Sequence, residues 1–269
     1  MDKRISIDPK ICHGQACIKG TRIPVHQIIR MMANGDTIEE LLGEYPSISR
    51  EDILACLDYV TSSSPWDFGN SILYDLCKNN PTHNKKEIVL AKIWLIGRSY
   101  AAAIERRKEK SSENDAFYIK DVTPTIMESK LDNNLSELNE YKEINDSNIK
   151  NILTVHKYLS DLFKKLTGLD KRSLSSKYLH FHKPELFFIY DSRAVNVLRN
   201  FISRTPSTYS DIIRSDTVDA EYAKFFIKSF ITVNNIATVL NYKLTPRAFD
   251  NLLIYIANNG NIAKSEASG

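Results

Sequence analysis

The chain has 269 residues, of which 42% are hydrophobic and 26% charged, so it can bury a sizeable core as one large domain or two smaller ones. Its net charge of +3 is too weak by itself to indicate a nucleic-acid binder. No stretch approaches the roughly 18 apolar residues of a membrane helix, and the first ten residues lack the apolar run of a signal peptide. We therefore expect no membrane contact. The four cysteines fit no disulfide framework, so we expect a cytoplasmic protein.

The first 35 residues predict a short β-hairpin followed by a helix. Apolar and polar residues alternate from Arg4, and a second extended run, ACIKGTRIPV, has Gly20 at the turn between its halves. From His26 an apolar stripe follows the helical period, and it ends at Asn34-Gly35, a pair typical of a helix C-terminus.

Two further helices are predicted from their N-terminal caps. Thr37 and Glu40 have the spacing of a capping box, and Ser49 precedes a helix with an acidic first turn. Two short helices joined by a tight turn containing Tyr45-Pro46 are compatible with a helix-turn-helix. We therefore expect residues 1–62 to form a hairpin and three-helix module.

The remainder predicts an all-α domain over residues 67–259, after a linker of Ser and Pro at 61–66. Residues 107–149 are rich in Lys, Glu, Asn, Asp and Ser, and we interpret them as a solvated insertion with weak helix. The last ten residues, 260–269, are expected to be disordered. The predicted fold class is thus mainly α. The expected helices cover residues 68–78, 86–106, 150–166, 172–181, 192–202, 219–239 and 246–257.

The run Gly20-Thr21-Arg22-Ile23-Pro24-Val25, followed by Tyr45-Pro46 and a final helix, lies within residues 5–60. In this order and spacing, the segment resembles the domain-of-unknown-function 433 family of antitoxin-like modules. The resemblance implies a small helix-turn-helix-type module that binds DNA or pairs with proteins. The partners that it implies are DNA, a nuclease toxin or another protein, and a second copy of the module in a homodimer.

Base reading by the helix of residues 49–60 is disfavoured, because that helix offers Arg50 and then acids where Arg, Lys, Asn or Gln would be needed. A structural role for Arg22, in an ion pair or on a carbonyl, is the alternative to a DNA contact. The phosphate contacts that we expect from this module come from Arg4, Lys10, Lys19, Arg22 and Arg30.

No metal site or cofactor is predicted. Cys12, His13 and Cys17 are close in sequence, but their spacing is not that of a zinc finger, and small buried residues are the favoured interpretation of the two cysteines. Nothing in the sequence indicates a nucleotide, a flavin or an iron–sulfur cluster.

Residues 166–201 carry a second pattern, in which Leu166-Thr167-Gly168 can open a turn between helices and Phe188 to Asp191 precede another helix. The stretch resembles the helix-hairpin-helix DNA glycosylases. The resemblance implies that the Asp191 carboxylate is catalytic: it would stabilise the electron-poor sugar left when a base is removed, and it would activate water. The alternative is that Asp191 only caps the helix that follows it.

The same resemblance implies a DNA-binding hairpin and a pocket for a flipped base. Two positions depart from the family. Asp170 stands where a second glycine is usual, and Arg172 stands where bifunctional members have a nucleophilic lysine. No lyase step is therefore expected, unless Lys171 or Lys177 takes that role. The implied DNA contacts are Gly168, Lys171, Arg172 and Lys177. The implied pocket residues are Tyr190, His180 and His182.

The sequence as a whole therefore predicts a DNA-binding protein whose larger domain recognises or excises a base, as a monofunctional DNA glycosylase. The alternative is a non-enzymatic, antitoxin-like transcriptional regulator whose C-terminal domain binds a partner protein. A purely structural helical interaction domain is the third interpretation.

Overall fold

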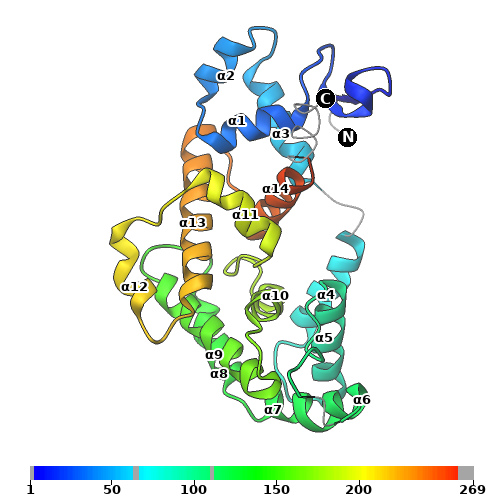
Figure 1. Cartoon of the computed structure of the whole chain (residues 1–269), viewed down its shortest axis with the longest axis vertical. Coiled ribbons are helices and arrows are strands. Elements are labelled where there is room, and N and C mark those ends of the chain that lie inside the picture. The colour runs from blue at the N-terminus through cyan, green and yellow to red at the C-terminus, as the bar shows by residue number, and fades with distance from the viewer. Residues whose placement is uncertain (1–2, 63–66, 110–111, 260–269) are drawn as a thin grey trace. The chain divides into compact units, whose positions relative to one another are not determined.

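The computed structural model describes residues 3–62, 67–109 and 112–259. The mainly α fold class is confirmed, with one two-stranded antiparallel sheet near the N-terminus followed by helices (Figure 1). The predicted tail, 260–269, and residues 63–66 of the predicted linker lie outside the described residues. Within the described ranges, no helix combines the length and the hydropathy that a membrane span would require.

The sheet pairs β1 (Ile5–Ile7) with β2 (Ala16–Ile18) in the register Ile5↔Ile18, and the short helix η1 (Cys12–Gly14) lies between the strands. The N-terminal helices are α1 (Val25–Asn34), α2 (Ile38–Glu44) and α3 (Arg50–Thr61). The next are α4 (Asp67–Asn79), α5 (Lys86–Ser99), α6 (Asn114–Phe117), η2 (Tyr118–Val122), α7 (Thr123–Met127), α8 (Leu131–Glu137) and η3 (Leu138–Glu140). The last are α9 (Ile149–Thr167), α10 (Arg172–His182), α11 (Ser192–Phe201), η4 (Ser207–Tyr209), α12 (Ser210–Arg214), α13 (Ala220–Leu240) and α14 (Pro246–Asn259).

The predicted caps of the first helices are confirmed. Gly35 ends α1 in the left-handed conformation, with φ +98°. The Thr37 amide donates to the Glu40 carboxylate at 2.7 Å while the Thr37 hydroxyl accepts from the Glu40 amide at 3.2 Å, which completes the capping box of α2. Ser49 and Asp52 form the same arrangement at the start of α3.

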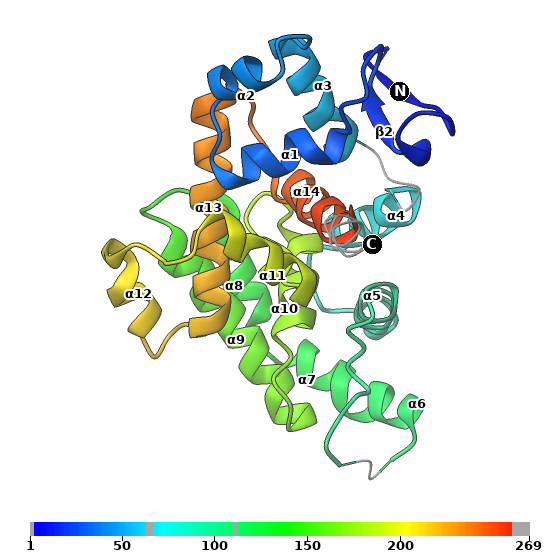
Figure 2. The ribbon, with the colours of Figure 1, turned by 45° about the horizontal axis from the view of Figure 1, so that its top comes forward.

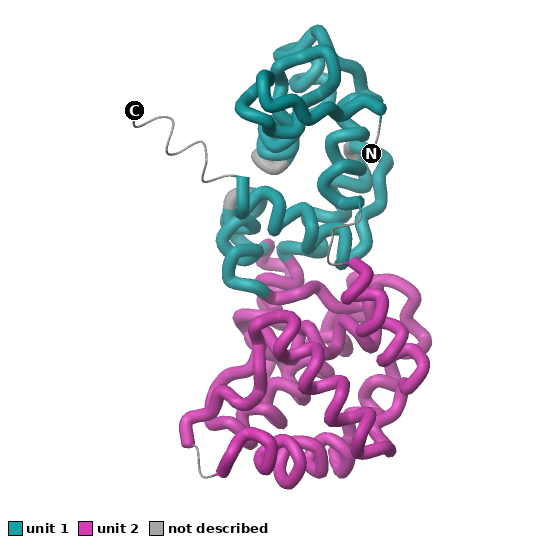
Figure 3. Tube along the Cα trace, turned by 90° about the vertical axis from the view of Figure 1, so that its right-hand side faces the viewer, with its two compact units in different colours: residues 1–63, 191–205, 228–269 teal, residues 64–190, 206–227 magenta. Residues whose placement is uncertain are grey.

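The chain folds into two compact units (Figure 3). Unit 1 comprises residues 1–63, 191–205 and 228–269, and unit 2 comprises residues 64–190 and 206–227. The hairpin and α1 to α3 therefore share a unit with α11, the second part of α13, and α14.

The C-terminal segment contributes to the core of unit 1. The Tyr59 ring meets the Tyr255 ring edge-on, with centroids 6.3 Å apart. The Tyr242 hydroxyl donates to Asp58 at 2.7 Å, close to the C-terminal end of α3. Figure 2 shows α14 beside α1, while the hairpin lies beside α1 and α3. Helices distant in sequence thus bury the apolar faces of α1 and α3.

The segment over 107–149, predicted to be solvated, is instead a set of short helices with buried apolar side chains. Tyr118, Val122 and Ile126 recur every fourth residue and are at most 2% exposed, and α7 packs against α5. The prediction was wrong because a polar average composition concealed apolar residues at helical spacing. Helix α5 also ends earlier than predicted, since Ala101 adopts φ +52° two residues after Ser99.

Candidate functional site

The end of the hairpin in unit 1 gathers basic side chains. Antiparallel pairing sets Lys19 opposite Arg4, and the Lys19 amide donates to the Arg4 carbonyl at 2.8 Å. The turn that follows β2 has Gly20 at φ +81°, a conformation that favours glycine, and Arg22 comes directly after this turn. The side chains expected to contact phosphate are all exposed: Arg4, Lys10, Lys19, Arg22 and Arg30.

These hairpin cations differ in their partners. Arg4 forms an ion pair with Asp52 at 2.9 Å. The side chains of Lys19 and Arg22 make no ion pair or hydrogen bond with another described residue. Only the main chain of Arg22 is engaged, since its carbonyl accepts from the Cys12 thiol at 3.3 Å. The charges of Lys19 and Arg22 are therefore available to a ligand.

Helix α3 is mainly a core element. Its exposed residues include Glu51 and Asp58, so the side that reaches solvent is acidic. At its N-terminus, the Arg50 guanidinium donates to the Leu240 carbonyl at 3.3 Å. Whether this helix reads bases is not tested by this arrangement, and its exclusion from base reading stays a prediction. The residues that α3 buries are Ile53, Ala55, Cys56, Leu57 and Val60.

Helix α11 presents a different face, which the sequence analysis did not single out. Arg193, Asn196 and Arg199 are exposed and lie three residues apart, on one side of the helix. Ala194 and Leu198 are at most 1% exposed, and the helix packs against α14 and α1. The signal in the sequence was the spacing Arg-x-x-Asn-x-x-Arg around the apolar residues Ala194, Val195, Val197 and Leu198.

Asp191 caps α11. One carboxylate oxygen accepts from the Arg193 amide at 2.9 Å and from the Arg193 Nε at 3.3 Å, which makes an ion pair. Its side chain is 26% exposed. Asp191 belongs to unit 1, whereas Gly168 belongs to unit 2. The capping role is observed, and the catalytic role stays a prediction.

The turn between α9 and α10 in unit 2 is where the sequence predicted a phosphate-binding hairpin. Gly168 ends α9 with φ +69°, and a Cβ added there would meet the Lys108 side chain at 3.1 Å. The buried Lys171 ammonium donates to the carbonyls of Ala103 at 3.2 Å and Arg106 at 2.5 Å. Burial lowers the pKa of Lys171 to about 8. Lys171 thus connects the turn between α9 and α10 to the segment of residues 103–106.

Arg172 and Lys177 are also engaged within unit 2. The Arg172 Nε donates to Asp219 at 2.7 Å, and its guanidinium lies 5.6 Å from the centre of the Tyr190 ring. The Lys177 ammonium donates to the Ser173 hydroxyl at 2.7 Å, and Lys177 is 3% exposed. Both side chains therefore donate to partners within unit 2.

The expected pocket residues lie in packed surroundings. The His180 ring, fully buried, bonds to the Phe187 carbonyl at 2.8 Å and to the Tyr74 hydroxyl at 2.6 Å. His182 bonds to the Tyr178 carbonyl at 2.8 Å, and burial holds its pKa well below the usual range. Tyr190 packs edge-on against Phe225, with centroids 5.2 Å apart.

Unit 2 contains a chain of polar contacts that leads from a half-exposed carboxylate into the core, and the sequence did not predict it. The His83 ring bonds to the Asp132 carboxylate at 2.5 Å and to the Tyr178 hydroxyl at 2.8 Å. The order carboxylate, imidazole, hydroxyl resembles a catalytic relay, but it ends on a phenol that is 0% exposed. A substrate could not reach that oxygen, so the chain serves the core. Its members are 46 or more residues apart in sequence, which explains why spacing did not reveal it.

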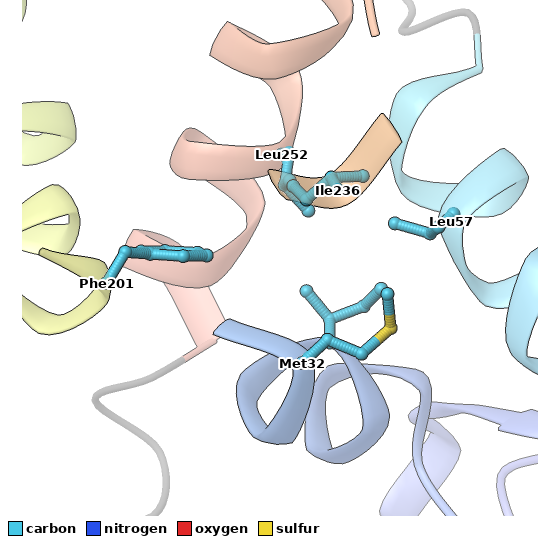
Figure 4. Close-up of a pocket in the computed structure, with 6 residues that line it drawn as sticks. Met32, Leu57, Phe201, Ile236 and Leu252 are labelled. Atoms are coloured by element: carbon cyan, nitrogen blue, oxygen red, sulfur yellow. The ribbon is translucent and has the colours of Figure 1, made fainter. Parts of the chain in front are cut away.

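Unit 1 contains a small apolar cavity (Figure 4). Its volume is about 10 Å³, close to the least that a single water molecule needs. Because its walls are apolar and it is so small, it offers no ligand site. The lining residues are Ile29, Met32, Leu57, Phe201, Ile236 and Leu252. Among the residues with a described placement, no group of three or more His, Cys, Asp or Glu side chains is arranged to hold a metal ion.

Comparison with known proteins supports the resemblance of the N-terminal part. Residues 5–60 match the model of a family described as "Protein of unknown function (DUF433)". This match covers the hairpin and α1 to α3 and does not extend to residues 166–201. The comparisons with curated proteins and with solved structures returned no match.

Proposed function

We propose that this chain is a DNA-binding protein that contacts the phosphate backbone of duplex DNA through the hairpin end of unit 1. The observation that carries the proposal is the exposure of Lys19 and Arg22 without a charged partner among the described residues. A cation that no acid neutralises can pair with a phosphate without losing an internal contact, and the counterions released from DNA favour binding. Arg4, across the register from Lys19, is held by its ion pair with Asp52, so the proposed contacts are Lys19 and Arg22.

The cations of unit 2 are less suited to contact DNA than those of the hairpin, because they already have partners. Lys171, Arg172 and Lys177 donate to carbonyls, to Asp219 and to a serine hydroxyl, respectively. Turning any of them toward DNA would leave those acceptors without their donor. The proposal is therefore the non-enzymatic regulator rather than the base-excising enzyme.

The proposed partner is duplex DNA in the cytoplasm, and the four free cysteines are consistent with a reducing compartment. A toxin or a second copy of the module, both implied by the family resemblance, would add to DNA binding rather than replace it. The stoichiometry of the DNA complex distinguishes a single chain from a pair.

The test is fluorescence anisotropy of a labelled random-sequence duplex titrated with the full chain at several salt concentrations. The variant carries Lys19→Ala and Arg22→Ala together. Its matched control carries Lys150→Ala and Lys165→Ala, which remove the same charge from exposed positions on α9 in unit 2. We expect the hairpin variant to bind more weakly and to lower the slope of log affinity against log salt by about 2.

The control variant should retain the wild-type slope to within about half of that change. Wild-type chain that does not bind duplex DNA contradicts the proposal. An equal loss of affinity in both variants also contradicts it, because the effect would then follow net charge rather than the hairpin.

A further inference from the structure

Helix α11 in unit 1 carries an exposed row of side chains that can read DNA sequence. The inference rests on the proposed function and goes beyond it, from the phosphate backbone to the bases. We infer that α11 enters the major groove of duplex DNA and that Arg193, Asn196 and Arg199 contact base edges there.

The position of the row on the helix supports a contact surface. Steps of three residues keep the three side chains on one side of an α-helix, within roughly a third of its circumference. The Arg193 side chain is 58% exposed, and Asn196 and Arg199 are also exposed. The opposite side is fixed, because Ala194 and Leu198 are buried where α11 packs against α14 and α1. Figures 1 and 2 both show α11 alongside α14.

The charge of this face complements DNA. Residues 192–201 include two arginines and no acid. The acid next to the helix, Asp191, caps it by accepting from the Arg193 amide at 2.9 Å, and it also pairs with the Arg193 guanidinium at 3.3 Å. Because Arg193 is exposed in this pair, a base contact can replace the pair at little cost. The side chains of Asn196 and Arg199 form no hydrogen bond or ion pair with other residues that the structure describes. Arg204, which follows the helix, is exposed as well.

The residue types match the chemistry of base recognition. A guanidinium can donate two parallel hydrogen bonds to guanine O6 and N7, and an asparagine amide can pair with adenine N6 and N7. The major groove, about 12 Å wide, admits an α-helix. The exposed acids of α3, Glu51 and Asp58, would instead repel the phosphates that flank the groove. Of these two helices of unit 1, α11 is the one suited to the groove.

The experiment is selection of bound duplexes from a random-sequence library, followed by sequencing, with the full chain and three variants. Asn196→Ala removes a base-reading amide without changing charge. The double variant Arg193→Lys with Arg199→Lys keeps both charges and loses the two-pronged geometry. The hairpin variant Lys19→Ala with Arg22→Ala removes phosphate contacts only.

We expect the wild-type chain to enrich a motif and the Asn196 variant to lose the preference at one base position by about tenfold. The Arg-to-Lys variant should lose the motif while its affinity for random duplex stays within about threefold of wild type. The hairpin variant should keep the motif at lower overall affinity. Since the substituted side chains are exposed, thermal unfolding of each variant should match that of the wild type.

The outcomes separate the two claims. Wild-type chain that binds duplexes without enriching a motif overturns base reading by α11 and leaves backbone binding intact. An unchanged motif in both α11 variants overturns it as well. Wild-type chain that captures no duplex contradicts the proposed function itself, and base reading falls with it.

Discussion

Two groups of basic residues, one in the hairpin and one at the turn between α9 and α10, differ in their exposure and in their hydrogen-bond partners. Lys19 and Arg22 are exposed and their side chains have no partner among the described residues. Lys171 is 8% exposed and donates to two main-chain carbonyls, and Arg172 is held by Asp219. The comparison shows that cations grouped in the sequence can be either exposed or held by internal partners, and that the fold decides which of them a ligand can reach.

The largest effect that separates the two regions is expected at Arg172. Replacing it with alanine leaves the Asp219 carboxylate, whose side chain is 14% exposed, without its guanidinium. Loss of one partner of this half-buried ion pair should lower the free energy of unfolding by about 2 to 3 kcal/mol. Arg22→Ala, the matched change at the hairpin, should alter it by less than about 0.5 kcal/mol. Urea unfolding of both variants measures the difference, and equal losses would remove the distinction between the regions.

The next effect is the response of unit 2 to acid. Burial lowers the pKa of His156 from 6.5 to about 3, so the unfolded chain takes up a proton below pH 6.5 that the folded chain does not accept until about pH 3. The contribution of the neutral His156 to the free energy of unfolding is therefore fully present above pH 6.5, and it is lost as the pH decreases toward 3. From pH 6.5 to pH 5 the loss from this group is about 2 kcal/mol.

His83 and His182 have pKa values shifted in the same direction by burial, which adds to the loss. Urea unfolding at a series of pH values measures the slope. The variant His156→Phe, which keeps an aromatic ring against Tyr222, should show a shallower slope between pH 6.5 and 5. A slope identical to that of the wild type would mean that His156 titrates normally and is not sequestered.

A smaller effect is expected at Asp191, where substitution tests whether this residue only caps α11 or also acts as the catalytic group of a glycosylase. Asp191→Ala removes the cap of α11 and should cost about 1 kcal/mol, whereas Asp191→Asn keeps a good cap and should cost only a few tenths. Thermal unfolding measures both. The wild-type chain should form no abasic sites in duplexes that carry uracil or alkylated bases. Abasic sites formed by the wild type and lost in the asparagine variant would instead support a glycosylase.

Much of the local structure could be predicted because its causes are local. The capping box at Thr37 and the left-handed Gly35 depend on residues within one helical turn, and both were confirmed. The packing of Tyr255 on Tyr59 could not be predicted, because nearly 200 residues separate them. The same holds for the pairing of Arg172 with Asp219, which decides whether that arginine is available to DNA. The positions of the cations could be taken from the sequence, but the residues that they contact could not.

The measurement that tests the central claim most directly is hydrogen exchange of the full chain with and without saturating duplex DNA. It records both regions in one experiment, on the unaltered protein. We predict slower amide exchange over residues 18–22 and 192–199 when DNA is bound, and unchanged exchange over residues 168–177. Protection confined to residues 168–177, with the hairpin and α11 unaffected, would contradict the account.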